Sequence, residues 1–140
     1  HRGAMNYTEQ TWPSDRWPNF SFNEAKCSHT GRCDINNGFM DQLQELRRRY
    51  DRPITVTSLY RHVTHPVEEA KEQPGAHTTG KAVDIAVSHA EAHTVLRLAM
   101  NMGVFLGVGV KQKGTGRFLH LDVLRNEEVS YIPRPRLWSY

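Results

Sequence analysis

The spacing of apolar positions predicts a first helix over residues 37–50. Its apolar side chains recur every three or four residues and therefore share one helical face. They are Phe39, Leu43, Leu46 and Tyr50. The polar side chains of Asp34-Ile35-Asn36-Asn37 can cap the start of this helix, and Asp51-Arg52-Pro53 ends it.

A second helical pattern runs from Ser88 to Gly103. Ser88-x-x-Glu91 has the form of a capping box. The apolar positions that follow recur at helical spacing and are expected to face the core. They are Ala92, Val95, Leu96 and Ala99. Gly103 is expected to end the helix, because glycine readily adopts the left-handed conformation found there.

Four stretches of apolar or β-branched residues predict strands. They are 54–59, 81–87, 104–110 and 117–123. The last two are joined by Lys-Gln-Lys-Gly-Thr-Gly, which predicts a hairpin. The segment 62–79 is polar and contains Pro66, Pro74 and Gly75, so we expect a loop there.

These elements predict an α+β fold, with a small, mainly antiparallel sheet and helices packed on one side. The length of 140 residues suits a single domain over 1–140. We expect an irregular N-terminal segment over 1–20 that wraps around the core. We also expect an extended tail over 125–140, anchored by Trp138, and a monomeric protein.

Composition and charge exclude several classes of function. The net charge of +3 is mildly basic, and Arg47 to Arg49 at the end of the first helix explain part of it. No nucleic-acid-reading motif is present, so we expect no nucleic-acid partner. We expect no membrane partner either, since no apolar run is long enough to cross a bilayer. No secretory signal is visible. A weakly basic surface also suits an anionic cell wall.

Two cysteines, Cys27 and Cys33, flank a short polar segment. They could form a local disulfide if the protein acts outside a reducing compartment, or remain free thiols. A structural metal site at this spacing would need a further ligand, and none is nearby in the sequence.

A different pattern carries the candidate chemistry. His77 and Asp84 lie seven residues apart around Gly80, and His120-x-Asp122 follows in an apolar run. Two imidazoles and a carboxylate fill three positions of a tetrahedral zinc site and leave the fourth for water, which distinguishes catalytic from structural zinc. We therefore predict that His77, Asp84 and His120 bind Zn²⁺.

Strand geometry supports this prediction. Side chains alternate along a strand, so His120 and Asp122 share one face while Leu119 and Leu121 share the other. Because the leucines must face the core, the two polar side chains point together into a cleft on the sheet. Asp84 stands among Ala, Val and Ile, and a carboxylate buried there must be paired or bound to metal.

Other histidines are weaker candidates. His89 and His93 lie one helical turn apart, but the glutamate between them does not directly follow the first histidine, as it does in zinc-protease helices. We interpret this pair as a solvated helix face. His62 and His65 are close to His77 in the sequence and are candidates for lining the cleft.

The same residues, in the same order, resemble the signature of the M15-type zinc peptidases. This family includes D-Ala-D-Ala carboxypeptidases and peptidoglycan endopeptidases, with small phage-type members, and is related to hedgehog-type zinc domains. The resemblance covers about residues 20–125. It implies that His77, Asp84 and His120 are zinc ligands. Ser58-Leu59-Tyr60-Arg61 is similar to a family segment whose arginine binds a substrate carboxylate or the oxyanion, which implies that role for Arg61.

The resemblance implies a zinc peptidase that hydrolyses peptidoglycan stem peptides, at either a D-Ala-D-Ala or an L-Ala-D-Glu bond. It implies a protein that acts on the bacterial cell wall, secreted or periplasmic, or a phage or prophage endolysin released at lysis. The alternative is a non-catalytic zinc-bound module that binds cell wall or forms part of a virion.

The chain departs from the family pattern at the general base. Many members carry an acidic residue three positions before the last ligand, where this chain has Arg117. Asp122, two residues after that ligand, is then the candidate base or proton shuttle. An orienting role for its carboxylate is an equal alternative. If Asp122 is not the base, the carboxylates left are Glu68, Glu69 and Glu72.

Overall fold

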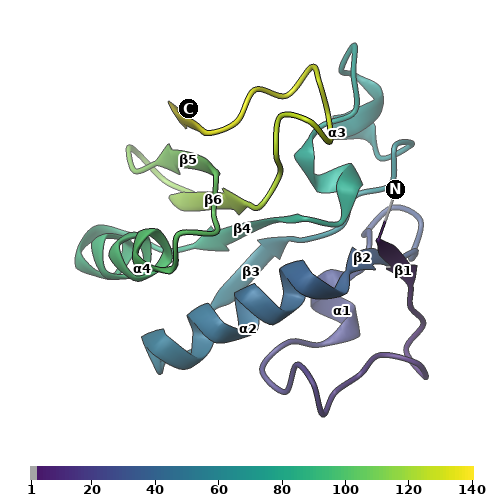
Figure 1. Cartoon of the computed structure of the whole chain (residues 1–140), viewed down its shortest axis with the longest axis horizontal. Coiled ribbons are helices and arrows are strands. Elements are labelled where there is room, and N and C mark those ends of the chain that lie inside the picture. Colours follow the sequence, from purple (N-terminus) through teal and green to yellow (C-terminus); the bar gives the residue numbers. More distant parts are fainter. Residues whose placement is uncertain (1–2) are drawn as a thin grey trace.

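The structure, a computed structural model, describes residues 3–140 and has the predicted α+β class (Figure 1). Its helices are α1 (Phe22–Ala25), α2 (Asn37–Tyr50), α3 (Pro66–Glu69) and α4 (His89–Met102), with a 3₁₀ helix at Ala76–Thr79. Its strands are β1 (Ala4–Asn6), β2 (Asp34–Asn36), β3 (Thr55–Ser58), β4 (Ala82–Ala86), β5 (Gly107–Lys111), β6 (Phe118–Asp122) and β7 (Arg136–Ser139).

Five strands form the main sheet, in the order β3-β4-β6-β5-β7. Neighbours are antiparallel except β5 and β7, which are parallel, and the predicted hairpin joins β5 to β6. Because β4 and β6 are neighbours, Asp84 lies directly opposite His120 in the register. Two predicted metal ligands therefore lie side by side in the middle of the sheet.

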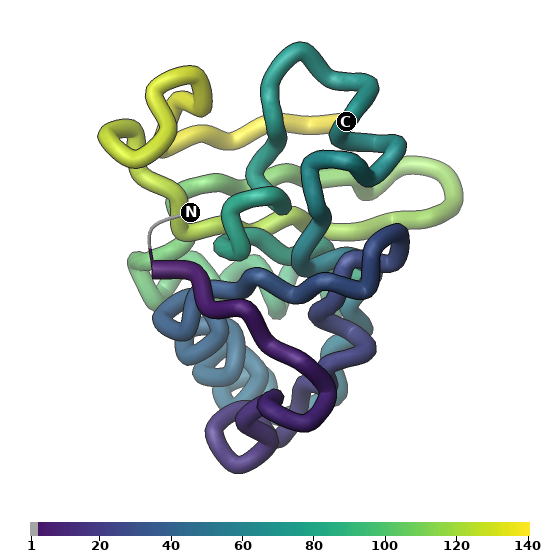
Figure 2. Tube along the Cα trace, turned by 90° about the vertical axis from the view of Figure 1, so that its right-hand side faces the viewer, coloured from purple at the N-terminus to yellow at the C-terminus, as the bar shows by residue number. Residues whose placement is uncertain are grey.

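Helices α2 and α4 contact each other on one side of the sheet, whereas α3 and the C-terminal segment lie on the other (Figures 1 and 2). The predicted apolar face of α2 is buried, as are alternate residues of the two central strands. These residues form one core cluster and include Phe39, Leu43, Leu46, Val83, Ile85, Leu119 and Leu121. The cluster leaves the opposite face of β4 and β6 available for the polar site.

The N-terminal segment, expected to be irregular, contains a short strand and packs against the core. Its first described residues form β1, which pairs with β2, while residues 1–2 lie outside the described part. Trp12 and Trp17 are buried. The indole of Trp17 donates a hydrogen bond to Asp41 on α2, with a nitrogen-to-oxygen distance of 2.9 Å. Aromatic packing and this bond hold the segment against the helix.

Two local predictions are wrong. The segment 62–79 is not a plain loop, because it contains α3 and the 3₁₀ helix. The predicted capping box at the start of α4 is absent, since the Ser88 side chain makes no cap bond. Glu91 instead accepts hydrogen bonds from Tyr50 and Arg52 at the end of α2. A contact between helices therefore replaces the local one.

The segment predicted as an extended tail, 125–140, is extended only near its end: turns and bends occupy much of 125–135, and Arg136–Ser139 form β7 in the sheet. Its β7 strand pairs with β5, and Trp138 lies opposite Gly109. Leu137, on the other face of β7, is 72% exposed. The four-residue strand is too short for its alternation to stand out from that of an extended loop, so the sequence alone did not reveal the pairing.

The cysteines are free thiols, and both Cys27 and Cys33 are fully buried. Burial raises the pKa of Cys33 to about 12. Of the two alternatives left open by the sequence, a local disulfide or free thiols, the structure has the free thiols. Within residues 3–140, no helix has the length and apolar character needed to cross a bilayer.

Candidate metal centre

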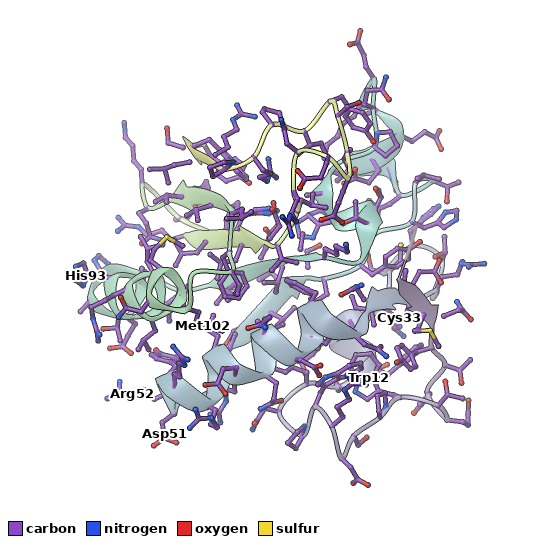
Figure 3. All side chains as sticks on the ribbon, viewed as in Figure 1. Trp12, Cys33, Asp51, Arg52, His93 and Met102 are labelled. Carbon is purple, nitrogen blue, oxygen red and sulfur yellow. The ribbon has the colours of Figure 1, made fainter. Side chains whose placement is uncertain are left out.

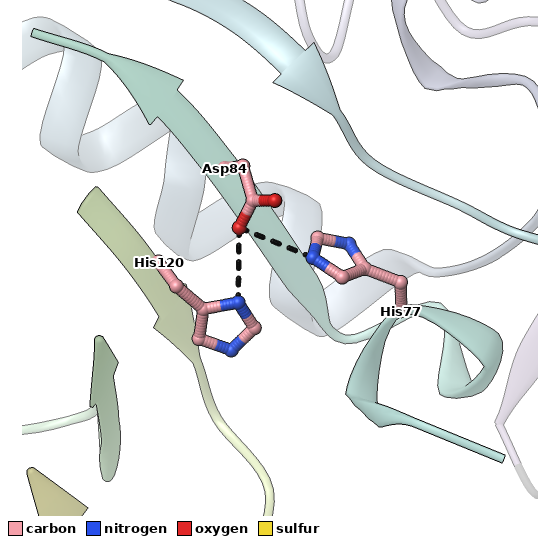
Figure 4. A group of neighbouring side chains, drawn as sticks. All are labelled: His77, Asp84 and His120. Atoms are coloured by element: carbon pink, nitrogen blue, oxygen red, sulfur yellow. Dashed lines mark hydrogen bonds and ion pairs between the residues drawn. The ribbon is translucent and has the colours of Figure 1, made fainter. Parts of the chain in front are cut away.

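The structure brings His77, Asp84 and His120 together in one buried group (Figure 4). They come from the 3₁₀ helix, β4 and β6 respectively. Their candidate ligand atoms all lie within 4.8 Å of one another. The Asp84 Oδ1 atom is 3.1 Å from His77 Nε2 and 3.0 Å from His120 Nδ1. Three of the four ligand positions of a tetrahedral metal site can be filled from this group.

Local backbone geometry places His77 near the other two. The 3₁₀ helix ends at Gly80, which adopts a left-handed conformation with φ of +73° and leads the chain into β4. A Cβ atom at Gly80 would lie 2.4 Å from the Asp34 carbonyl oxygen. The chain therefore turns at this glycine, and the tight packing there excludes other residues.

Hydrogen bonds fix which nitrogen of each imidazole is available to a metal. The Nδ1 atom of His77 lies 2.7 Å from the Leu59 carbonyl oxygen, which can only accept, so Nδ1 carries the proton and Nε2 faces Asp84. The Nε2 atom of His120 lies 2.7 Å from Asp122 and donates to it, which leaves Nδ1 facing Asp84. Partners of this kind orient the imidazoles that bind metals. The three residues therefore fit a divalent metal ion.

The protonation preferences of two of these residues also suit metal binding. Burial lowers the pKa of His77 and favours its neutral form. Burial alone would raise the pKa of Asp84, but hydrogen bonds from His120 and His77 outweigh it, and the pKa of Asp84 lies well below its usual value. Metal ligands must be deprotonated, so a neutral imidazole and an ionised carboxylate are the forms required.

Asp122 lies beneath His120 and is completely buried. Arg134 donates two hydrogen bonds to its carboxylate, from Nε at 2.8 Å and from Nη2 at 2.6 Å, and the Leu124 backbone donates a third. Burial alone would raise the pKa of Asp122, but the hydrogen bonds from His120 and Arg134 lower it. Asp122 is thus an ionised carboxylate held against one imidazole of the triad.

The pattern Gly107-x-Gly109 on β5 makes room for this arrangement. A Cβ atom at Gly107 would lie 2.3 Å from either Asp122 carboxylate oxygen, and one at Gly109 would lie 2.6 Å from Trp138 Nε1. Both positions face the site, because they pair with Asp122 and His120 of β6. The two glycines, at alternate positions in an apolar strand, are a signal in the sequence that this face of β5 lies close to other groups.

Gly107→Ala is expected to destabilise the protein by about 1–3 kcal/mol, because the added methyl group overpacks the Asp122 carboxylate. Urea denaturation would measure the change. Gly38→Ala in the first turn of α2 is the control, since its Cβ would have a nearest neighbour at 3.2 Å, the Asn36 side chain. Equal stability of the two variants would contradict the prediction.

The triad opens into a cavity of about 490 Å³. Its wall includes Arg61, the residue predicted to bind substrate. The Arg61 Nη2 atom is 3.6 Å from Asp84, and its Nη1 atom is 3.1 Å from Glu68. Glu68 is buried and also pairs with Lys71. Among residues 3–140, Asp84 is the one carboxylate that lines this cavity. Asp122 does not line it.

The other candidate histidines lie apart from the triad. His89 and His93 are exposed on α4, where His93 projects outward (Figure 3). His65 accepts a hydrogen bond from the Val67 backbone at the start of α3, and neither His62 nor His65 lines the cavity. Arg117, three residues before His120, donates to the Gly114 carbonyl in the β5–β6 hairpin.

An α+β fold with a His-Asp-His group lining a cavity is the arrangement expected of a metal-dependent enzyme domain. Comparison with protein families matches residues 18–122 to the family Peptidase M15. The match covers more than half of the chain, so the chain belongs to this family and is a metallopeptidase. Neither a search of curated proteins nor one of solved structures found a match.

Proposed function

We propose that this protein is a zinc peptidase that hydrolyses peptidoglycan stem peptides, at a D-Ala-D-Ala or an L-Ala-D-Glu bond. The supporting observation is the triad itself, with one nitrogen of each imidazole and one Asp84 oxygen directed at each other in a peptide-sized cavity. Two imidazoles and one carboxylate leave a coordination position open, which is typical of catalytic zinc. A role at the cell wall, including release as a phage endolysin, belongs to the same proposal.

The chemistry that a bound zinc ion supplies at such a site is Lewis acidity, which polarises a carbonyl group and acidifies water. His77, Asp84 and His120 would hold the ion. The chain's own residues do the rest. The Leu59 carbonyl and Asp122 keep the two imidazoles in the required tautomers. The surrounding buried residues exclude bulk water, which strengthens electrostatic interactions in the cavity.

Arg61 is proposed to bind the substrate carboxylate or to stabilise the negative oxygen that develops on the scissile carbonyl. Its guanidinium lies 3.6 Å from Asp84 and forms an ion pair with the buried Glu68, which holds it in place. Burial alone would raise the pKa of Glu68, but hydrogen bonds from Gly75, Arg61 and Lys71 outweigh it and lower the pKa. The Glu68 carboxylate therefore stays ionised. A fixed, charged fork of N–H donors suits carboxylate recognition.

Arg61→Ala is expected to lower kcat/KM by on the order of a hundredfold, because a positioned donor to developing charge is lost. Metal content should stay at the wild-type level, since Arg61 is not a ligand. Arg61→Lys should recover little, because lysine lacks the planar fork. Arg117→Ala, in the hairpin outside the cavity, is the matched control. Wild-type activity in Arg61→Ala would contradict the assignment.

Asp122 is proposed to orient His120 rather than to act as the base, because it is buried behind the imidazole and held by Arg134. Asp122→Asn is therefore expected to weaken zinc affinity by about tenfold or more, and added zinc should restore most of the rate. Zinc titration followed by assay at saturation would measure both. A zinc-saturated variant that remains slower by a hundredfold would instead assign Asp122 as the proton acceptor.

The function is tested by digestion of purified peptidoglycan with the zinc-loaded protein. Mass spectrometry of the released fragments would identify the cleaved bond. Fragments cut within stem peptides, absent after chelation of the metal, are the expected result. Binding of the protein to intact peptidoglycan without any release would favour the non-catalytic module. The observation in its favour is that, within residues 3–140, no side-chain carboxylate other than Asp84 lines the cavity.

A further inference from the structure

One wall of the cavity comes from the C-terminal segment, which lies beyond the part of the chain that matches the family. The match ends at residue 122, yet this segment contributes a large share of the lining. Its lining residues include Tyr131, Arg134, Arg136, Trp138 and Tyr140. Within the sheet, the β7 strand of this segment is the edge strand next to β5. The chemistry of this wall therefore comes from residues outside the part of the chain that the family match covers.

The position of Trp138 on this wall is set by the sheet. Trp138 pairs with Gly109 across β7 and β5, and its indole fills the space that a side chain at Gly109 would occupy. Its ring centroid lies 5.0 Å from that of His120. An aromatic surface is thereby fixed beside a residue of the triad.

Arg136 stands on the same face of β7, two residues before Trp138. Its guanidinium carbon lies 5.5 Å from the centroid of the Trp138 ring, a cation–π distance. The side chain is exposed and, within residues 3–140, has no carboxylate partner at ion-pairing distance. Arg136 therefore offers its hydrogen-bond donors to a ligand.

The other cations of the cavity differ in this respect. Arg61 and Lys71 are both paired with Glu68. Arg134 is paired with Asp122 and is buried. Among the four cationic lining residues, Arg136 alone carries a charge that no carboxylate in the described part of the chain offsets.

The order of strands places Arg61 and Arg136 on opposite sides of the triad. Arg61 follows β3 at one edge of the sheet, and Arg136 belongs to β7 at the other edge. Asp84 and His120 lie on β4 and β6 between them. A peptide whose scissile bond lies over the triad can therefore meet one arginine on each side of that bond.

We propose that Arg136, supported by the face of Trp138, binds a second, internal carboxylate of the peptide substrate. This carboxylate belongs to an acidic residue on the opposite side of the cleaved bond from the group that Arg61 holds. The aliphatic part of that residue would lie against the indole. In a stem peptide the matching group is the free carboxylate of the γ-linked D-Glu residue. The inference rests on the proposed function and names the feature of the substrate that the C-terminal wall selects.

The test compares two forms of acetyl-L-Ala-γ-D-Glu-L-Lys-D-Ala-D-Ala, one with the D-Glu α-carboxylate free and one with it amidated. Binding of dye-labelled peptides to zinc-loaded protein is followed by fluorescence anisotropy immediately after mixing, and cleavage is assayed separately. Arg136→Gln is expected to weaken binding of the free-carboxylate peptide by about tenfold to a hundredfold. Binding of the amidated peptide should change by less than about twofold. Arg136→Lys should give an intermediate loss.

Arg97→Gln, an exposed site on α4 at the other face of the sheet, removes the same charge and is the control. It should bind both peptides as the wild type does. Equal losses for both peptides in Arg136→Gln, or a wild type that does not distinguish them, would overturn the inference. Cleavage without this discrimination would leave the proposed function standing. Discrimination in binding without cleavage would retain Arg136 as the anion-binding residue and refute the proposed hydrolysis of stem peptides.

Discussion

His77→Ala and His120→Ala are each expected to abolish stoichiometric metal binding and to lower the rate of hydrolysis at least about a thousandfold. Each imidazole supplies one of only three protein ligands. One hydrogen bond holds each imidazole in the required tautomer: His77 donates to the Leu59 carbonyl, and His120 donates to Asp122. Two remaining ligands cannot hold zinc at the affinity of a catalytic site.

Elemental analysis of the purified variants, combined with the peptidoglycan assay, measures both effects. His93→Ala is the matched control, since this histidine is exposed on α4 and should leave metal content and rate unchanged. Full metal stoichiometry in both triad variants would refute the site. Loss in the control as well would show that the measurement reports folding and not ligation.

The second large effect concerns Arg134. Arg134→Met is expected to lower the free energy of unfolding by about 3–5 kcal/mol, because it leaves the ionised carboxylate of Asp122 buried without its cationic partner. Metal affinity should fall as well, since Asp122 would no longer be fixed against His120. Chemical denaturation of the metal-free protein isolates the first effect, and a zinc titration isolates the second.

Arg136→Met is the control for stability, because Arg136 is exposed and has no carboxylate partner within residues 3–140. It should unfold within about 0.5 kcal/mol of the wild type. If Arg134→Met were as stable as the wild type, the Asp122 carboxylate would have to be protonated or hydrated when Arg134 is missing.

The elements with strong periodicity were predictable from the sequence. The helix at 37–50 and the β5–β6 hairpin follow from spacing and turn chemistry, and both are present. The proximity of His77, Asp84 and His120 also followed, because strand alternation and a glycine turn limit where these side chains can point. Their roles as zinc ligands remain a prediction for the experiments above.

The contacts that complete the site were not predictable. Arg134 reaches the Asp122 carboxylate because the segment that carries it pairs in parallel with β5 through β7. No local sequence pattern predicts the partner of a parallel strand. Glu68 meets Arg61 only because α3 folds back within a segment that reads as a polar loop. Such contacts depend on packing between elements, and packing routinely overrides local preference.

The two buried cysteines have a practical consequence. Because both sulfur atoms are shielded from solvent and neither is oxidised to a disulfide, reagents that modify accessible thiols have no target in the folded chain. A single cysteine introduced on the surface, for example at the rim of the cavity, can then carry a spectroscopic label without prior removal of the native pair. The rate at which the native thiols themselves become modified reports how often the region that follows α1 opens.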